Sequence, residues 1–260
     1  MEYIAHSETH AGMEIEVWQD QDTGSGGPHG DMDCLAPMLA VDGSTRGATP
    51  YGASDTGDFD PMDYASEVEI MLNVEKIIEI MDECRADVWD DIMISRDANH
   101  HPFAFPADFA DVLKERWSNA ESSPQYRRDL DKRAALFHLF NIPAHVETSR
   151  GYSQGDCSEV LCVHLPEWRA KVGTPEYDLT KEADREAVKK DMIGDIGTWS
   201  CWAWGNVYGF TVSDPDGEAN DEHCGGFYTE PWGDDWEYLL SEARARAEEM
   251  AKDRALAIAA

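Results

Sequence analysis

A β-hairpin with an acidic turn is the feature of this sequence that most constrains its fold. Residues 207–212 form a β-prone run, and a second β-prone run ends in Gly225-Gly226-Phe227-Tyr228. Between them lies Asp214-Pro215-Asp216-Gly217, where Pro presets φ and Gly supplies a positive φ. This order of strand, turn and strand predicts a β-hairpin, and the surrounding aromatic residues are expected to pack on one face of its sheet.

Carboxylates crowd the tip of this predicted hairpin. No Lys or Arg occurs between Asn206 and Glu230, so we expect a bare anionic tip. Further acids open the last predicted helix, where they also stabilise the helix through its macrodipole. The candidate partner-binding residues are therefore Asp214, Asp216, Glu218, Asp221 and Glu222 of the tip, with Asp234, Asp235 and Glu237 of the helix.

The chain as a whole is strongly acidic. Its 260 residues contain 53 Asp and Glu against 21 Lys and Arg, which gives a formal net charge of −32. Such an excess repels itself and needs salt or a cationic partner, and it argues against direct binding to nucleic acid or to an anionic membrane. A hydrophobic content of 42% and nine Trp residues indicate a folded protein and not a disordered acidic segment.

The sequence also predicts a compartment. Its first residues lack the basic and apolar regions of a signal peptide, and no apolar run approaches the ~18 residues of a membrane span. Six Cys residues without C-x-x-C spacing are typical of free thiols in a reducing compartment. We expect a cytoplasmic protein without a membrane partner.

The hydrophobic pattern predicts one acidic α+β domain over residues 1–260. Residues 1–67 are interpreted as a loop-rich acidic part with one strand, Glu14–Trp18, in which polar and apolar residues alternate. Residues 68–123 are interpreted as a helical part, and residues 124–260 as hairpins plus a C-terminal helix. We therefore expect a small, mostly antiparallel sheet, built from two β-hairpins and the N-terminal strand and covered by helices.

Helical spacing and capping residues place the elements inside these parts. A second hairpin is predicted on either side of the turn Gly151–Gly155, with its second strand over 156–165. Asp63 or Ser66 is expected to cap the first long helix. The predicted helices cover residues 67–85, 107–118, 123–140, 178–192 and 234–259.

The turn of the second hairpin is a candidate catalytic group. Tyr152, Gln154 and Asp156, with His145 and His164 on the flanking strands, could form an acid–base group. The alternative is a simple turn whose polar side chains bond to backbone amides. No P-loop, G-x-G-x-x-G, G-x-S-x-G or H-E-x-x-H motif supports catalysis, and we expect no enzyme activity.

Metal binding is the next alternative. Thiolates and imidazoles are zinc ligands, and the adjacent hairpins could bring five of them together. Two of these, Cys157 and Cys162, face opposite sides of a single strand, so buried thiols are the simpler interpretation. The loops at Asp20 and Asp214 are rich in oxygen ligands but do not match a 12-residue calcium loop. We expect no metal and no cofactor; the five candidate zinc ligands are Cys157, Cys162, His164, His223 and Cys224.

Tryptophans cluster just before the first predicted hairpin. Trp199, Trp202 and Trp204 could stack on a ligand, but core packing explains them more simply.

Three sequence blocks resemble a family of acidic proteins encoded by bacteriophages and other mobile elements. The blocks are SRGYSQGD at 149–156, WGNVYGF at 204–210 and CGGFY at 224–228, and residues 14–20 are similar to the family's opening strand. Asn206 and Gly225 stand where that family has Asp and Trp. The resemblance implies a mobile-element setting and no particular reaction.

Charge and resemblance together favour a DNA mimic. Duplex DNA carries one negative charge per ~1.7 Å of axis, so a charge of this size corresponds to roughly 54 Å of duplex. We expect an anti-defence inhibitor that binds the basic nucleic-acid channel of a host restriction or CRISPR-type complex. Two alternatives remain open: a halophilic or merely acidic protein, and a small metal-dependent enzyme centred on Tyr152–Asp156.

Overall fold

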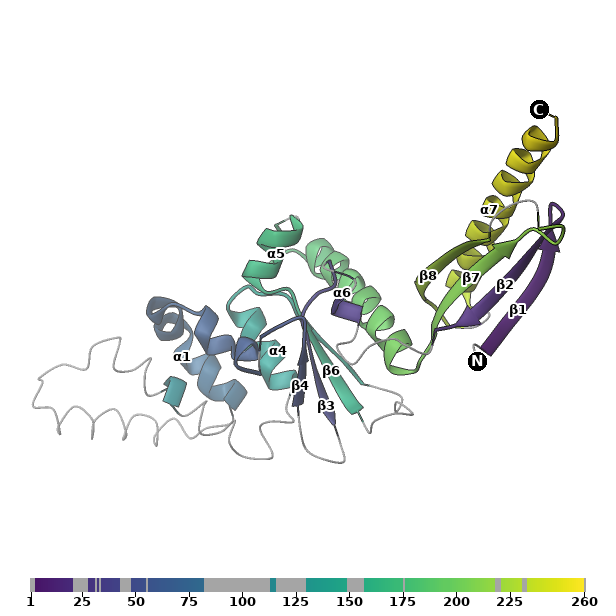
Figure 1. Ribbon diagram of the computed structural model, residues 1–260. Helices are drawn as coiled ribbons and strands as arrows, with labels where there is room; N and C mark the ends of the chain where they lie inside the picture. Colours follow the sequence, from purple (N-terminus) through teal and green to yellow (C-terminus); the bar gives the residue numbers. More distant parts are fainter. Residues whose placement is uncertain are drawn as a thin grey trace, which may run out of the picture. The chain divides into compact units, whose positions relative to one another are not determined.

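The computed structural model divides into two compact units, and each is built around a four-stranded antiparallel sheet (Figure 1). Unit 1 comprises residues 1–28 and 197–260, and unit 2 comprises residues 29–196. The α+β class with antiparallel sheets is thereby confirmed. The structure has two sheets where one small sheet was expected. The divisions of the chain expected at residues 67 and 123 do not coincide with the ends of these units. That the chain forms a single domain stays a prediction. The structure describes residues 3–20, 28–30, 32, 34–42, 48–54, 56–81, 113–115, 130–148, 157–174, 176–217, 221–230 and 233–259.

The sheet of unit 1 contains the predicted acidic hairpin. Its order is β1-β2-β7-β8, with bounds β1 Tyr3–His10, β2 Met13–Gln19, β7 Val207–Ser213 and β8 Glu222–Tyr228. The pairing of β7 with β8 confirms the first hairpin, and β2 contains the predicted strand Glu14–Trp18. Strand β1 was not expected, because none of its residues is fully buried and they give little hydrophobic pattern.

One face of this sheet is buried against a long helix, α7 (Asp234–Ala259). Alternate residues of β2 enter the core, while Glu14 and Glu16 between them are exposed on the opposite face. Helix α7 contributes residues at helical spacing, which is the pattern that predicted it. The core consists of Met13, Ile15, Val17, Tyr208, Phe210, Val212, Trp236, Leu239, Leu240, Ala243, Ala247 and Met250.

The sheet of unit 2 contains the second predicted hairpin. Its order is β4-β3-β6-β5, with bounds β3 Met38–Asp42, β4 Ala48–Tyr51, β5 Ala144–Thr148 and β6 Cys157–Val163. Strands β5 and β6 pair as expected, and the turn between them lies outside the described residues. The expectation of a loop-rich region before residue 67 is wrong for β3 and β4. Strand β3 is paired on both sides and its residues 38–41 are all buried, so it shows a short apolar run and no alternation.

Helices accompany this second sheet, and α4 packs on β5 and β6. Ser66 and Glu69 form a capping box at the start of α1: the Ser66 amide and hydroxyl donate to the Glu69 carboxylate, and the Glu69 amide donates to Ser66 Oγ. Helix α5 (Pro166–Val172) was not predicted, and α6 (Glu182–Ala203) begins later than residue 178 and extends beyond residue 192. No described helix is both long and apolar enough to cross a bilayer. The helices are α1 Glu67–Met81, α4 Leu130–Leu139, α5 Pro166–Val172 and α6 Glu182–Ala203, with 3-10 turns η1 Pro28–Gly30, η2 Thr56–Phe59 and η3 Pro61–Tyr64.

Candidate functional site

The tip of the acidic hairpin is not bare. The side chain of Asp214 is fully buried, and Arg254 on α7 donates a hydrogen bond to its carboxylate at 3.0 Å. The other end of the Arg254 guanidinium pairs with Asp216. The bare tip predicted from the local sequence is therefore wrong, because its cation comes from a helix forty residues further along the chain. A guanidinium held between these two carboxylates also removes the case for a calcium loop here.

Two more arginines of α7 pair with acids in the same way. Arg244 bonds to Glu8 of β1 and to Glu237, and Arg246 bonds to Glu222 of β8 and to Glu249. Each guanidinium thus joins α7 to the sheet or to the turn. Because each arginine meets two carboxylates, every such group keeps a net negative charge.

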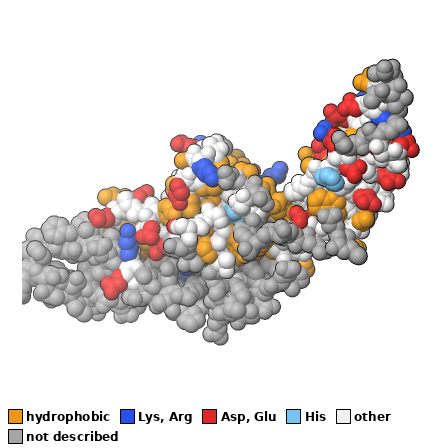
Figure 2. All heavy atoms as spheres, viewed as in Figure 1, with side chains coloured by type: hydrophobic (Ala, Val, Ile, Leu, Met, Phe, Trp, Pro, Cys, Tyr) orange, Lys and Arg blue, Asp and Glu red, His pale blue; other side chains and the backbone are white. Residues whose placement is uncertain are grey.

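The remaining predicted contact residues differ in their exposure. Asp221 and Asp235 are exposed, and no ion pair of theirs occurs among the described residues. Glu218 and the side chain of Asp234 lie outside the described residues. Figure 2 shows acidic side chains over the visible face of unit 1, with basic side chains between them.

The candidate catalytic turn cannot be placed, since Tyr152, Gln154 and Asp156 all lie outside the described residues. Its two flanking histidines have different surroundings. His145 on β5 lies 3.2 Å from the Glu147 carboxylate, whereas His164 follows β6 and is buried.

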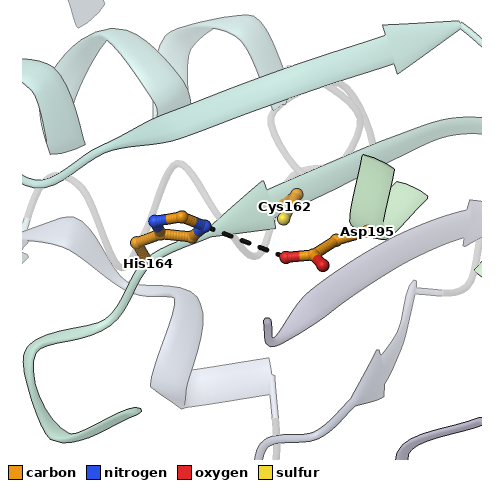
Figure 3. Close-up of side chains that lie close together, drawn as sticks. All are labelled: Cys162, His164 and Asp195. Carbon is orange, nitrogen blue, oxygen red and sulfur yellow. Dashed lines mark ion pairs between the residues drawn. The ribbon is translucent and has the colours of Figure 1, made fainter. Parts of the chain in front are cut away.

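His164 belongs instead to a group with Cys162, which is also buried, and Asp195, which is partly exposed. One ligand atom from each residue lies within 4.8 Å of the other two. Cys162 lies on β6 one residue before the strand ends, His164 follows two residues after Cys162 on the same side, and Asp195 comes from α6. Figure 3 shows the His164 ring facing the Asp195 carboxylate at 3.9 Å, with the Cys162 sulfur beside them.

The histidine of this group is deeply buried and lies against an aromatic ring. His164 is only 2% exposed, and neither of its ring nitrogens has a hydrogen-bond partner. Trp168 of α5 lies against its ring, with ring centroids 4.6 Å apart. Burial raises the pKa of the Cys162 thiol well above its ordinary value of 9.0, and the Asp195 charge adds to the rise. An uncoordinated Cys162 is therefore a thiol at neutral pH and not a reactive nucleophile.

A pocket of about 370 Å³ opens in the same unit. Leu165 and Trp168, which follow His164 in sequence, contribute to its wall, as does His29. The imidazole of His29 bonds to the Ala36 carbonyl at 2.9 Å, and its Nδ1 is buried without a partner. Burial lowers the pKa of His29, while the Asp195 charge opposes that shift.

Sequence reasoning found part of this group. It gave Cys162 and His164 as candidate zinc ligands, although no metal was expected, and grouped them with Cys157 and with His223 and Cys224, which belong to β8 of the other unit. There His223 Nδ1 lies 2.8 Å from the Thr211 hydroxyl. The third member, Asp195, was missed because no spacing rule connects a helical carboxylate to a strand thirty residues earlier.

The tryptophan cluster lies at the end of α6 and is only partly buried: Trp199 and Trp202 are on the helix, and Trp204 is in the turn that follows it. Trp199 is buried and its ring lies 6.2 Å from that of Trp202, while Trp204 is exposed. Core packing thus accounts for Trp199.

No protein-family model matches this chain, and no curated protein or solved structure is significantly similar to it.

Proposed function

We propose that this protein is an acidic anti-defence inhibitor that binds the basic nucleic-acid channel of a host restriction or CRISPR-type complex in place of DNA. The residues of unit 1 carry the argument, because they are more acidic than the chain average. In sequence, unit 1 contains nineteen acidic residues and four basic ones.

The observation that supports the proposal is the excess of carboxylates left after internal pairing. Arg244, Arg246 and Arg254 each engage two carboxylates, so each of these three ion-pair groups keeps a net negative charge. Carboxylates held in fixed positions by a helix and a sheet resemble the fixed phosphates of a duplex, and they would release counterions in the same way on binding a basic channel.

The structure changes which residues we assign to the contact. The side chain of Asp214 is buried and pairs with Arg254 of α7, so we assign it a structural role and not a partner contact. Asp221 and Asp235 remain candidates from the original set, and we add the exposed acids Glu242 and Asp253 of α7. The inhibitor would act by occupying the channel, with long-range attraction giving fast association that weakens with salt.

Competition with DNA tests the proposal. Purified restriction and CRISPR-type nucleases are titrated with the protein while DNA binding is followed by fluorescence anisotropy and DNA cleavage on gels. We expect displacement of DNA from at least one enzyme, with an apparent affinity that falls roughly 10³–10⁵-fold between 50 and 200 mM salt for about 6–10 ion contacts. Failure to displace DNA from any of these enzymes at low salt would contradict the proposal.

Matched charge reversals locate the contact. The test variant replaces three exposed acids of unit 1 by Lys: Asp221, Glu242 and Asp253. The control variant replaces three exposed acids of unit 2 by Lys: Glu79, Glu176 and Glu186. Both variants change the net charge equally. We expect the first to slow association strongly and the second to change it little; equal effects would mean that overall charge, and not unit 1, drives binding.

The halophilic alternative predicts the opposite salt response. The chain has eight Lys against thirteen Arg, which agrees with adaptation to high salt. A protein of that kind should unfold on dilution into low-salt buffer, because screening holds its charges together. An inhibitor of the proposed kind should stay folded there, as circular dichroism would report.

A further inference from the structure

His164, which is buried in unit 2, has no hydrogen-bond partner for either ring nitrogen within the described part of the chain. Buried polar side chains almost always have hydrogen-bond partners, since leaving one unpaired is costly. His164 is more than nine-tenths buried, yet both of its nitrogens are without a partner and its Nε2 faces Asp195 at 3.9 Å. That separation is too long for a direct hydrogen bond.

The side chains of Cys162, His164 and Asp195 together form a set of possible zinc ligands. Thiolate, imidazole and carboxylate are the three ligand types that bind Zn²⁺ in proteins. With usual bond lengths, the nitrogen and oxygen ligands of a tetrahedral zinc ion lie about 3.4 Å apart. A contraction of roughly half an ångström from the observed 3.9 Å therefore suffices for His164 and Asp195 to bind one ion.

We propose that Cys162, His164 and Asp195 form a zinc site, with the fourth coordination position taken by water or another small ligand. Three protein ligands and one open position are the arrangement of catalytic zinc sites, whereas structural sites are closed by four protein ligands. Among the described residues, no fourth His, Cys, Asp or Glu joins the group.

Neighbouring residues suit this assignment. Trp168 covers the His164 ring and limits access of bulk water to it. The pocket lined by Leu165 and Trp168 begins one residue from His164, which gives a small ligand space near the open position. This site is independent of the proposed inhibition, because it lies in unit 2 and uses none of the acids assigned to the partner.

A thiol nucleophile is the competing interpretation of the same three residues. It requires an accessible sulfur that a substrate can reach. Cys162 is fully buried, with an exposed fraction of 0%, so the geometry favours a metal ligand.

Metal titration of the full chain tests the site. The protein is stripped with a chelator, Zn²⁺ alone is returned, and the bound metal is measured by elemental analysis and by competition with a chromophoric chelator. We expect one zinc per chain. We expect Cys162→Ser and Asp195→Asn each to weaken binding by more than the ~10–100-fold that losing an outer-shell partner costs.

Two variants serve as matched controls. Cys224→Ser removes an exposed thiol, and Asp191→Asn removes a carboxylate one helical turn before Asp195. Both should bind zinc like the wild type. Zinc should raise the melting temperature of the wild type and of these controls but not that of Asp195→Asn, a readout that also shows that this variant is folded.

Cobalt tests the ligand set and the open position. Co²⁺ in place of zinc should give a tetrahedral spectrum with a sulfur charge-transfer band that Cys162→Ser abolishes, and azide should shift it. A wild type that binds no zinc, or zinc bound equally well by Cys162→Ser and Asp195→Asn, would overturn the site. A cobalt spectrum insensitive to azide would overturn the open position.

Discussion

Arg254, near the end of α7, donates a hydrogen bond at 3.0 Å to the carboxylate of Asp214, whose side chain is completely buried at the start of the hairpin turn. The same carboxylate accepts a hydrogen bond from the Asp216 amide at 3.0 Å, which shapes the turn. One residue thus fixes the turn and docks the C-terminal part of α7.

Removing Arg254 should be costly because it leaves a buried carboxylate without its cation. We expect Arg254→Met to lower the free energy of unfolding by about 3 kcal/mol, as for other broken buried pairs. Adding Asp214→Asn should restore part of the loss, since no buried charge then remains while an oxygen still accepts the turn amide. Urea unfolding measures both, and a double variant no more stable than Arg254→Met would contradict this account.

Arg246 provides the comparison for that experiment. Its partners Glu222 and Glu249 keep 37% and 61% of their side-chain surface exposed. Arg246→Met should therefore cost much less than Arg254→Met.

Acid should weaken the attachment of β1 to α7. The hydrogen bond from Arg244 lowers the pKa of Glu8 from 4.5 to about 2. Because the folded-state pKa lies below the unfolded one, the contribution of Glu8 is complete above pH 4.5 and disappears as the pH falls toward 2. We expect Glu8→Gln to cost roughly 1 kcal/mol at pH 7 and much less at pH 2, measured by urea unfolding at both values; a cost independent of pH would contradict it.

Gly209 should not tolerate a side chain. A Cβ at this position of β7 would lie 2.4 Å from ring atoms of Trp18 and 2.8 Å from the Cys224 carbonyl oxygen. We expect Gly209→Ala to destabilise the protein by about 1–3 kcal/mol in thermal unfolding. Gly194→Ala, where a Cβ meets open space on α6, should instead stabilise by about 0.5–1 kcal/mol.

Trp236 should anchor α7 to its sheet. Its ring meets Tyr208 of β7 edge-on at 5.0 Å, and the residue is 2% exposed. We expect Trp236→Ala to cost about 3–5 kcal/mol. Tyr238→Ala, two residues further on and mostly exposed, should cost far less in the same denaturation assay.

Local patterns predicted the elements whose stability is local. The Asp-Pro-Asp-Gly turn, the alternation in β2, the capping residue Ser66 and the apolar stripe of α7 all appear in the structure as expected. Each depends on residues a few positions apart, so its signal is contained in a short window of sequence.

Long-range pairings were not predictable in this way. Nothing in the hairpin sequence indicates that β2 joins β7 or that β3 joins β6, so the two hairpins were assigned to one sheet when they lie in two. The same holds for the candidate site, where Cys162 and His164 were found and Asp195 was not.

The sequence by itself determined the acidic character of the protein, its α+β class and the positions of its hairpins, because these follow from composition and from neighbours along the chain. Only the tertiary structure decided which charges are available. It buried the Asp214 side chain next to Arg254. It also placed the Asp195 carboxylate of α6 beside the Cys162 thiol of β6 and the imidazole of His164, which follows that strand. The physical reason is that charge pairing and ligand sets depend on distances in space, and these are set by how helices and sheets pack.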